Sequence, residues 1–246
     1  MKVDVLVGRR PVVELLRGGR AAQAILLSER ARRAKVIDEI RELAAAKGVP
    51  LKTVPVEEIE RLAEGENHQG VAALTSRFRY GQMRDLLSGP APTLLFLDGV
   101  MDPHNLGSLL RTADGSGFSG IVIPAHRSVA VNQTVRRVSA GAAEVVPVAR
   151  VGNLGAAIDE ARRGGLWIAG LDSSGEEDIW SSNLMEPPVG LVLGAEDRGI
   201  SRGVKEKCDA LVSIPSRGRI ESLNVSVAGA VAMFEVARRR DGSATL

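Results

Sequence analysis

The most constraining feature of this sequence is an alternation, over residues 93–240, of short apolar runs with segments of helical periodicity. Chains with this alternation form a mostly parallel sheet that is covered by helices on both faces. We expect strands at residues 94–97, 121–123, 144–147, 166–170, 189–193 and 211–214. We expect helices at residues 106–113, 154–161 and 225–238. The sequence therefore predicts an α/β domain over residues 93–246.

A second, smaller alternation occupies residues 1–76. Its expected strands are residues 3–7, 24–27, 51–54 and 71–74, and its expected helices are residues 11–16, 31–46 and 56–63. The longest of these helices is followed by Lys47, Gly48 and Pro50, which are typical of a helix end. Residues 77–92 combine arginines with glycines and prolines, which favours a linker. We therefore predict a compact α/β domain of about 75 residues that a linker joins to the larger one.

Composition excludes several classes of protein. One cysteine, Cys208, among 246 residues excludes an intrachain disulfide and favours a reducing cytoplasm. No apolar run approaches the ~20 residues of a membrane span, and no basic leader precedes an apolar block, so we expect no membrane anchor and no signal peptide. The three histidines are scattered, so no Cys/His spacing indicates a metal site. Residues 1–90 hold 16 Lys and Arg against 12 Asp and Glu, a modest positive excess that permits a nucleic-acid surface.

Three segments leave an expected strand through a polar loop, namely residues 96–113, 191–200 and 211–228. In the third segment, Ser222 and Asn224 directly precede an apolar helix, where their side chains can satisfy the free N–H groups of its first turn. The carboxyl ends of parallel strands meet at one edge of a sheet, and open α/β sheets bind their ligands there. The three segments therefore predict one composite site.

Residues 115–120 spell Gly-X-Gly-X-X-Gly, which is the fingerprint of dinucleotide-binding enzymes. That fingerprint works after a strand and before a helix, because the helix N-terminus faces the pyrophosphate. Here it follows an expected helix and precedes an expected strand, so we interpret it as a helix end and a turn. A nucleotide-dependent oxidoreductase is accordingly a minor alternative.

Together the three segments resemble the signature segments of the SpoU (TrmH-type) RNA 2′-O-ribose methyltransferases. The matching residues are Asn105, Gly107 and Arg111 in the first, Gly194, Glu196 and Gly199 in the second, and Ser222, Leu223 and Asn224 in the third. The resemblance implies a trefoil-knotted sheet, a homodimer with its site near the interface, and S-adenosylmethionine as methyl donor. It also implies a catalytic set made of Asn105, Arg111, Glu196, Ser222 and Asn224, and cofactor contacts from Gly194, Gly199, Ile214 and Leu223.

Arg111 is the residue that the resemblance most strongly links to catalysis, through activation of the 2′-hydroxyl. Because a guanidinium titrates above ~12, it is a poor proton acceptor. We expect it instead to bind the phosphate beside the target ribose and to stabilise developing alkoxide charge. Glu196 stands in an apolar segment, where an unpaired carboxylate is costly, so we expect it to pair with Arg111 or to bond a helix cap.

Residues 1–76 resemble the ribosomal-protein-like RNA-binding domain that some members of this family carry. This attachment points to the branch that methylates a guanosine of large-subunit (23S) ribosomal RNA. Arg9, Arg10, Arg17 and Arg20 are then candidate phosphate contacts, with a solvated basic face as the competing interpretation. The loop at residues 217–221 is more highly charged than the family pattern, which puts the substrate in question.

Alternatives remain open within and beyond this chemistry. A tRNA methylase and an antibiotic-resistance rRNA methylase would use the same residues. A non-catalytic RNA-binding assembly factor would not need the five catalytic candidates together, so their presence favours an enzyme. Binding of S-adenosylmethionine but not of a nicotinamide cofactor would separate the methylase from the oxidoreductase.

Overall fold

The computed structural model describes residues 4–18, 22–31, 34–216, 218 and 223–243. It divides into two compact units, one formed by Met1–Arg79 with Val131–Val145 and the other by Tyr80–Ala130 with Val146–Leu246. Across the described part of the chain, none of the helices combines the length and the apolar character that crossing a membrane requires.

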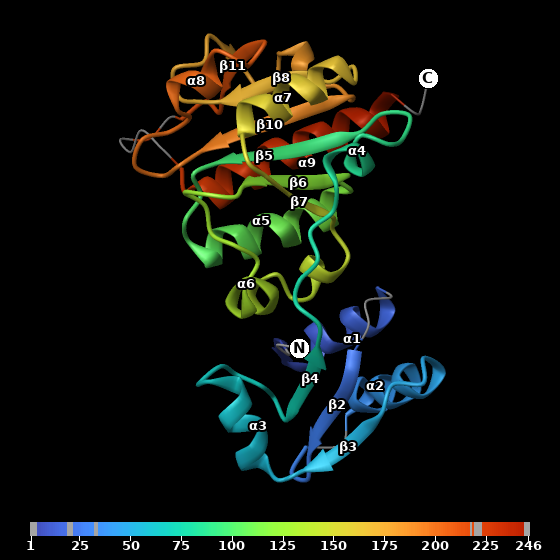
Figure 1. The fold of residues 1–246 in the computed structure, drawn as a ribbon. Helices are drawn as coiled ribbons and strands as arrows, with labels where there is room; N and C mark the ends of the chain where they lie inside the picture. Colours follow the sequence, from blue (N-terminus) through green and yellow to red (C-terminus); the bar gives the residue numbers. More distant parts are fainter. Residues whose placement is uncertain (1–3, 19–21, 32–33, 217, 219–222, 244–246) are drawn as a thin grey trace. The chain divides into compact units, whose positions relative to one another are not determined.

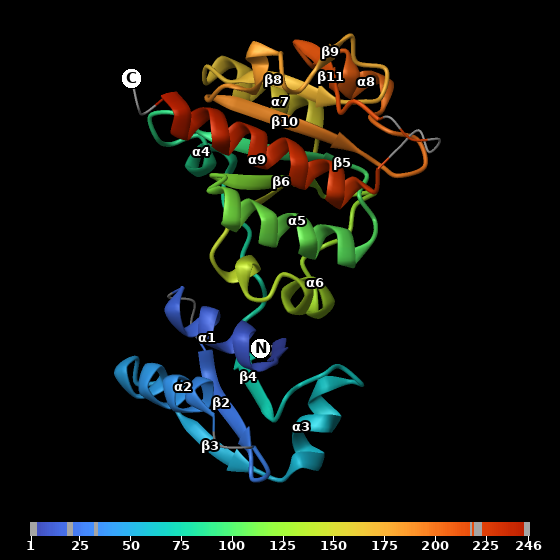
Figure 2. The same ribbon diagram turned by 180° about the vertical axis from the view of Figure 1, so that it is seen from behind.

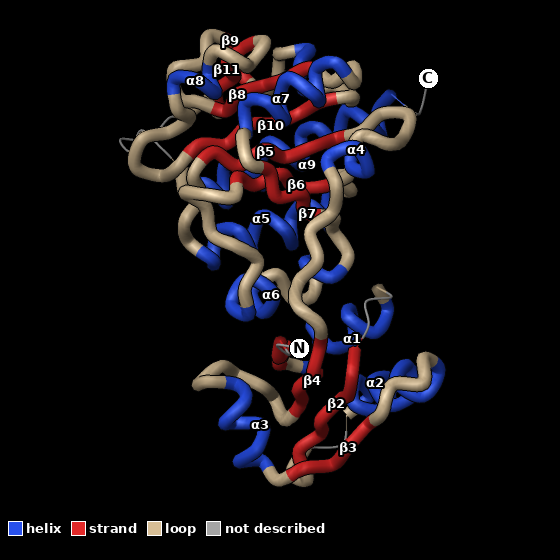
Figure 3. Tube along the Cα trace, viewed as in Figure 1, coloured by secondary structure: helices blue, strands red, loops and turns tan. Residues whose placement is uncertain are grey.

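The first unit contains a four-stranded sheet in the order β1-β4-β2-β3. Figure 3 shows three of these strands, β4, β2 and β3. Its strands are β1 (Asp4–Val7), β2 (Ala22–Ser28), β3 (Leu51–Val54) and β4 (Val71–Thr75). Its helices include α1 (Arg9–Arg17), α2 (Lys35–Ala46) and α3 (Val56–Ala63). Along β2, Ile25 and Leu27 pack in one apolar cluster with α1 and α2, whereas Leu26 packs in another with α3. Because alternate side chains of a strand face opposite sides, helices cover both faces of this sheet.

The start of α2 differs from the expected helix at 31–46. The structure begins α2 at Lys35, and Ala31 lies in a turn closed by its N–H donating to the carbonyl of Ser28 at 2.8 Å. This turn packs against Gly70, where an added Cβ would lie 3.3 Å from the Ala31 Cβ. At the other end the expectation is confirmed, since Gly48 adopts a φ of +64° directly after the helix.

Residues 131–145 belong to the first unit and form α6 (Gln133–Val138) and a 3₁₀ turn, η1 (Ala142–Glu144). The strand expected at 144–147 was therefore wrong, and the nearest strand, β7, begins only at Val148. The physical reason is that Glu144 is fully buried against Arg136, whose Nε lies 2.6 Å from the Glu144 Oε1. Arg136 also donates from Nη1 to Thr75 Oγ1 in β4 at 3.3 Å.

The second unit contains the expected parallel α/β sheet, but it begins at Tyr80 instead of residue 93 and excludes residues 131–145. Its seven-stranded sheet has the order β7-β6-β5-β10-β8-β11-β9, and every neighbouring pair is parallel. The strands are β5 (Thr93–Asp98), β6 (Gly120–Pro124), β7 (Val148–Val151), β8 (Trp167–Leu171), β9 (Glu177–Asp178), β10 (Val189–Gly194) and β11 (Ala210–Ser213). The helices are α4 (Met83–Leu86), α5 (Pro103–Ser116), α7 (Leu154–Arg163), α8 (Arg202–Lys205) and α9 (Val225–Ser243), with the 3₁₀ turn η2 (Asn183–Met185).

Helices cover both faces of this parallel sheet, as predicted. On one face, α4, α7 and α8 pack on Phe96, Val122 and Val192 (Figure 1). On the other face, α5 and α9 lie side by side (Figure 2). The two helices approach closely because α9 has Gly229, where an added Cβ would lie 2.4 Å from Leu109 Cδ2 of α5. The trefoil knot stays a prediction.

The segment interpreted as a linker contains α4, which is part of the core of the second unit. Met83 and Leu86 are buried there. Gly81 forms an isolated parallel bridge with Ala149 next to β7. The second half of residues 77–92 is therefore packed against the sheet.

Candidate active site

A cavity of 230 Å³ opens at the carboxyl ends of β8, β10 and β11, where α9 begins. Its lining residues are Leu171, Asp172, Ser173, Leu193, Gly194, Ala195, Glu196, Gly199, Ile214, Ser216, Leu223, Val225 and Ala228. Gly194, Gly199, Ile214 and Leu223, the four residues predicted to contact a cofactor, all lie in this lining. The expected convergence of the strand ends is therefore present in the structure.

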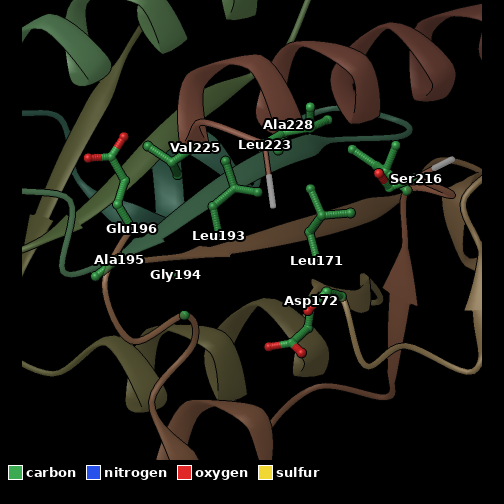
Figure 4. A pocket seen from close by; sticks show the side chains of 13 residues that line it. Leu171, Asp172, Leu193, Gly194, Ala195, Glu196, Ser216, Leu223, Val225 and Ala228 are labelled. Carbon is green, nitrogen blue, oxygen red and sulfur yellow. The ribbon is translucent and has the colours of Figure 1, made fainter. Parts of the chain in front are cut away.

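Apolar and polar groups occupy different parts of this cavity. Leu193 and Leu171 stand between Glu196 at one end and Ser216 at the other, and Val225 belongs to the first turn of α9 (Figure 4). An apolar wall with few polar groups is typical of sites that hold a small organic ligand. The cavity can therefore pack against an aromatic ring and an alkyl chain while hydrogen bonding to their polar ends.

Gly194 lines the cavity, and its missing side chain also leaves room for the backbone of the following turn. An added Cβ would lie 2.0 Å from the carbonyl carbon of Gly199. The turn at residues 195–199 folds back on β10 here, held by mutual backbone hydrogen bonds between Ala195 and Gly199 at 2.8 and 3.0 Å. Gly199 adopts a φ of +65°, which favours glycine. Both glycines therefore shape the turn that carries Glu196.

Asp172 is a lining residue that the sequence reasoning missed. Burial acts to raise its pKa, but hydrogen bonds from Lys205 and Ser174 outweigh burial and hold the pKa below its ordinary value. The Lys205 Nζ lies 2.6 Å from Asp172 Oδ2, and Ser174 Oγ donates to Oδ1 at 2.6 Å. The cavity therefore contains an ionised carboxylate. Its position directly after the expected strand at 166–170 was a usable signal, because the other site residues also follow strand ends.

Glu196 is held by two asparagines from different elements. Asn105 Nδ2 donates to Glu196 Oε1 at 3.0 Å, and Asn224 Nδ2 donates to the same oxygen at 2.5 Å. Asn224 Nδ2 also lies 3.2 Å from Asn105 Oδ1, while Asn224 Oδ1 accepts from the N–H of Ser226 at 2.9 Å. Asn224 thus caps α9, as expected. Asn105 is not a cap, because Asp102 caps α5 by accepting from the N–H of His104 at 2.8 Å.

A second cavity of 270 Å³ adjoins the first one. It is lined by Gly99, Val100, Met101, Asp102, Asn105, Ala195, Glu196, Asp197 and Val225. Ala195, Glu196 and Val225 line both cavities. Glu196 therefore belongs to the wall that the two cavities share.

Arg111 lies apart from this group. It is exposed on α5 and forms no hydrogen bond or ion pair with the described residues, and it lines neither cavity. Arg111 follows Asn105 by six positions, and this offset corresponds to about 9 Å along the axis of a helix. Of the two arrangements expected for Glu196, pairing with Arg111 is not found. The bond to a helix cap is found, since Glu196 accepts from Asn224, and it also accepts from Asn105. Ser222 lies outside the described residues.

The candidate RNA contacts of the first unit differ in their surroundings. Arg9 is half-buried at the start of α1, and Arg10 is exposed. Arg17 at the end of α1 pairs with Glu14 at 3.0 Å and with Glu39 at 2.5 Å. Arg20 lies outside the described residues.

Cys208 lines neither of the two cavities. Burial raises the pKa of the Cys208 thiol to about 12, and the Sγ donates to the carbonyl of Val204 at 3.5 Å. It packs against the core of the second unit, as expected of a small apolar residue. Among the residues that the structure describes, no cluster of three His, Cys, Asp or Glu could hold a metal ion.

Two family models match the chain. The SpoU rRNA Methylase family matches residues 92–234, and the model for RNA 2′-O ribose methyltransferase substrate binding matches residues 5–81. The Bacillus subtilis (strain 168) protein YacO, described as a TrmH family tRNA/rRNA methyltransferase, is 38% identical over 243 residues. That alignment covers 97% of this chain and 96% of the relative.

Solved structures share the fold. An AdoMet-bound rRNA methyltransferase from Sinorhizobium meliloti is 26% identical with a TM-score of 0.81, covering 96% of this chain and 87% of its own. A TrmH/SpoU tRNA modifying enzyme from A. aeolicus is also 26% identical, with a TM-score of 0.57, but covers only 66% of this chain and 82% of its own.

Proposed function

Because this chain belongs to the SpoU rRNA methylase family, we propose that it methylates the ribose 2′-hydroxyl of a guanosine in large-subunit (23S) ribosomal RNA. The family membership makes it an RNA methyltransferase whose methyl donor is S-adenosylmethionine. The observation that carries the proposal is the pair of cavities that meet at Glu196, since a transferase needs donor and acceptor sites that share one wall.

The 230 Å³ cavity is the proposed cofactor site. Gly194, Gly199, Ile214 and Leu223 keep their assignment to it, and Asp172 joins them. The apolar wall suits the adenine ring and the methionine chain, and the Asp172 carboxylate, held by Lys205 and Ser174, offers a hydrogen-bond acceptor to the polar groups of the cofactor. When bound, the cofactor supplies a methyl group on a positively charged sulfur.

The 270 Å³ cavity is the proposed site of the target nucleotide. Glu196 faces it and can accept a hydrogen bond, and then the proton, from the 2′-hydroxyl. Asn105 and Asn224 fix the orientation of this carboxylate by donating to Oε1. Holding the hydroxyl in line with the methyl group accounts for much of the catalysis, because positioning alone is worth on the order of 7–11 kcal/mol in well-oriented reactions.

A homodimer is the proposed working form. Phe234 of α9 is 53% exposed and Val227 is 49% exposed, which is unusual for apolar residues on a helix that packs on a core. Phe234 packs beside Gly115 of α5, since its Cζ would lie 3.8 Å from a Cβ added there. Arg111 stands four residues before Gly115 and so shares this surface. Dimerisation through α5 and α9 would cover the apolar side chains and bring Arg111 of one protomer toward the site of the other.

The proposed ribosomal substrate is supported by the first unit. The rRNA methyltransferase from Sinorhizobium meliloti aligns with almost the whole chain, whereas the tRNA modifying enzyme aligns with two thirds of it. An enzyme that acts on ribosomal RNA would work in the cytoplasm.

The test is methyl transfer from labelled S-adenosylmethionine to unmodified large-subunit rRNA and, separately, to tRNA, followed by mapping of the methylated ribose. A single methylated guanosine in the rRNA is the expected result. Label in tRNA alone would overturn the substrate, and the absence of label in both RNAs with the cofactor bound would favour the non-catalytic assembly factor.

A further inference from the structure

The first unit contains a cavity of its own, with a volume of 430 Å³. Segments that are distant in the sequence line it: the start of α1, the turn after β2, the start of α3 and the loop before β4. Its lining residues are Arg9, Ser28, Arg30, Ala31, Val56, His68, Gln69 and Gly70.

The side chain of Arg9 is oriented by Gln69. The Arg9 Nε donates to the carbonyl oxygen of Gln69 at 3.1 Å, and the Arg9 backbone N–H donates to Gln69 Oε1 at 3.3 Å. Gln69 has a φ of +50°, a conformation that residues other than glycine rarely adopt. These bonds leave the terminal nitrogens of Arg9 and the Nε2 of Gln69 as hydrogen-bond donors for a ligand.

His68 and Ser28 add two donors. The Nδ1 of His68 accepts from the N–H of Gly70 at 3.0 Å, so the proton of the neutral ring is assigned to Nε2, which can donate. The Oγ of Ser28 accepts from the N–H of Arg30 at 3.1 Å, which leaves the hydroxyl hydrogen available. The hydrogen bonds within the wall therefore use the acceptor atoms of these two side chains and leave their donors available to a ligand.

The electrostatic environment of the cavity is positive. No carboxylate is among its lining residues, and neither Arg9 nor Arg30 forms an ion pair with a described residue. Arg17 at the far end of α1 contrasts with them, because two glutamates pair with it. A cavity with two guanidinium groups and further side-chain donors suits a ligand with an anionic group and additional acceptors.

We infer that this cavity binds one unpaired nucleotide of the substrate RNA. Arg9 and Arg30 hold its phosphate, and the acceptor edge of its base faces His68 and Gln69. The volume lies in the 300–1,000 Å³ range of pockets for small organic ligands and exceeds what a bare anion requires. A base inside a duplex cannot enter such a pocket, whereas bases in loops and bulges can be turned outward. The inference rests on the proposed action on RNA.

The test compares two isosteric changes of equal charge in the full-length protein. Gln69→Glu places a carboxylate in the cavity and keeps the oxygen that accepts from Arg9, while Gln23→Glu makes the same change at an exposed position of β2. The probe is a labelled transcript of unmodified large-subunit rRNA, and the readout is its Kd by fluorescence anisotropy. We expect at least a tenfold weaker Kd for Gln69→Glu and less than a twofold change for Gln23→Glu. Equal effects of the two changes, or no effect of Gln69→Glu, would overturn the inference.

A second pair of variants tests the phosphate contact. Arg30→Gln should weaken binding and lower the slope of log Kd against log salt by about one. Arg41→Gln changes an exposed arginine of α2 outside the cavity and should leave the Kd and the slope nearly unchanged.

A blunt RNA duplex should bind equally to the wild-type protein and to Gln69→Glu. If duplex binding falls as much as transcript binding, the cavity does not select unpaired nucleotides.

These readouts separate this inference from the proposed methylation. At saturating transcript, Gln69→Glu should keep the wild-type kcat with a raised KM, and its affinity for S-adenosylmethionine should not change. An inactive wild-type protein would contradict the proposed reaction, but the comparison of RNA affinities would still decide the role of the cavity.

Discussion

The amide of Asn105 donates to the carboxylate of Glu196 at 3.0 Å, which joins the first turn of α5 to the turn after β10. Asn105 is buried whereas Glu196 is exposed, so the donor side of this bond is shielded from water and the acceptor side is not. Since Asn224 donates to the same oxygen, Glu196 Oε1 is saturated and Oε2 is the atom available to a substrate.

Glu196→Gln should lower kcat by at least about 100-fold, because the amide oxygen can still accept from the two asparagines but cannot take up a proton. The Kd for S-adenosylmethionine should stay within a few-fold of wild type. Single-turnover methylation and calorimetric titration measure the two quantities. A variant with normal kcat would remove Glu196 from the proton transfer.

Gly194→Ala should destabilise the protein by about 1–3 kcal/mol or more, since its Cβ would overlap the backbone of the turn that ends at Gly199. The matched control is Gly203→Ala in α8, where an added Cβ meets no atom within 4 Å. That change should be neutral or stabilising by up to about 1 kcal/mol. Urea unfolding of the two variants would show the difference, and equal stabilities would contradict the packing described for Gly194.

Arg111→Ala should abolish turnover while the affinity for S-adenosylmethionine stays within a few-fold of wild type. The reason is that Arg111 lines neither cavity, and its proposed role is to bind the phosphate beside the target ribose. Methylation by this variant at the wild-type rate would contradict the proposed catalytic role of Arg111.

Mixing the inactive Arg111→Ala and Glu196→Gln proteins should restore activity, because a mixed dimer with a shared site has one intact pair of these residues. With random exchange of protomers, up to about a quarter of the wild-type rate is expected. Methyl transfer measured before and after mixing gives the result. If activity does not return although mass spectrometry detects mixed dimers, Arg111 and Glu196 act within one protomer.

Asp172→Asn should weaken binding of S-adenosylmethionine about tenfold, a loss of roughly 1.4 kcal/mol, by removing a negative charge from the cavity. The hydrogen bonds that lower the Asp172 pKa keep the carboxylate ionised well below neutral pH, so its contribution should persist at pH 5. That contribution is lost only as the pH falls through the lowered pKa. Calorimetric titrations at pH 7.5 and pH 5 would test this, and a cofactor affinity of Asp172→Asn equal to wild type would exclude the contact.

Cys208 should react slowly with an alkylating reagent at pH 8, because its pKa is raised to about 12 while an exposed thiol titrates near ~8.5. The rate should continue to rise with pH above 9 in the folded protein and level off near pH 9 in guanidinium chloride. Mass spectrometry of the alkylated protein follows both rates. A folded protein that reacts as fast as the unfolded chain would contradict the burial.

The arrangement of the site was predictable because strand ends in a parallel sheet meet at one edge. Asn105, Glu196 and Asn224 were expected from three separate segments, and they form one hydrogen-bonded group. The expected pairing of Arg111 with Glu196 was wrong, and helical geometry explains why. Six residues along a helix turn a side chain by about 240°, so Asn105 and Arg111 cannot face the same carboxylate.

Other features carried too little sequence signal. The helix α8 and the strand β9 contain four and two residues, too few for a hydrophobic period to develop. At residues 144–147 the two valines resemble a strand. Glu144, however, is buried in the first unit, where it pairs with Arg136, and only that contact reveals its position. Such a pairing depends on tertiary structure, which a local pattern does not record.

The assignment of residues 131–145 to the first unit has a consequence for the evolution of the protein. The chain passes between the two units three times, so the amino-terminal unit is not a cassette that recombination could add or remove by a single junction. A shortened gene encoding residues 93–246 alone would lack Thr75, which bonds the buried Arg136, and would uncover the Arg136–Glu144 pair. A lineage that lost the first unit would therefore also have to replace Arg136 and Glu144 with uncharged residues.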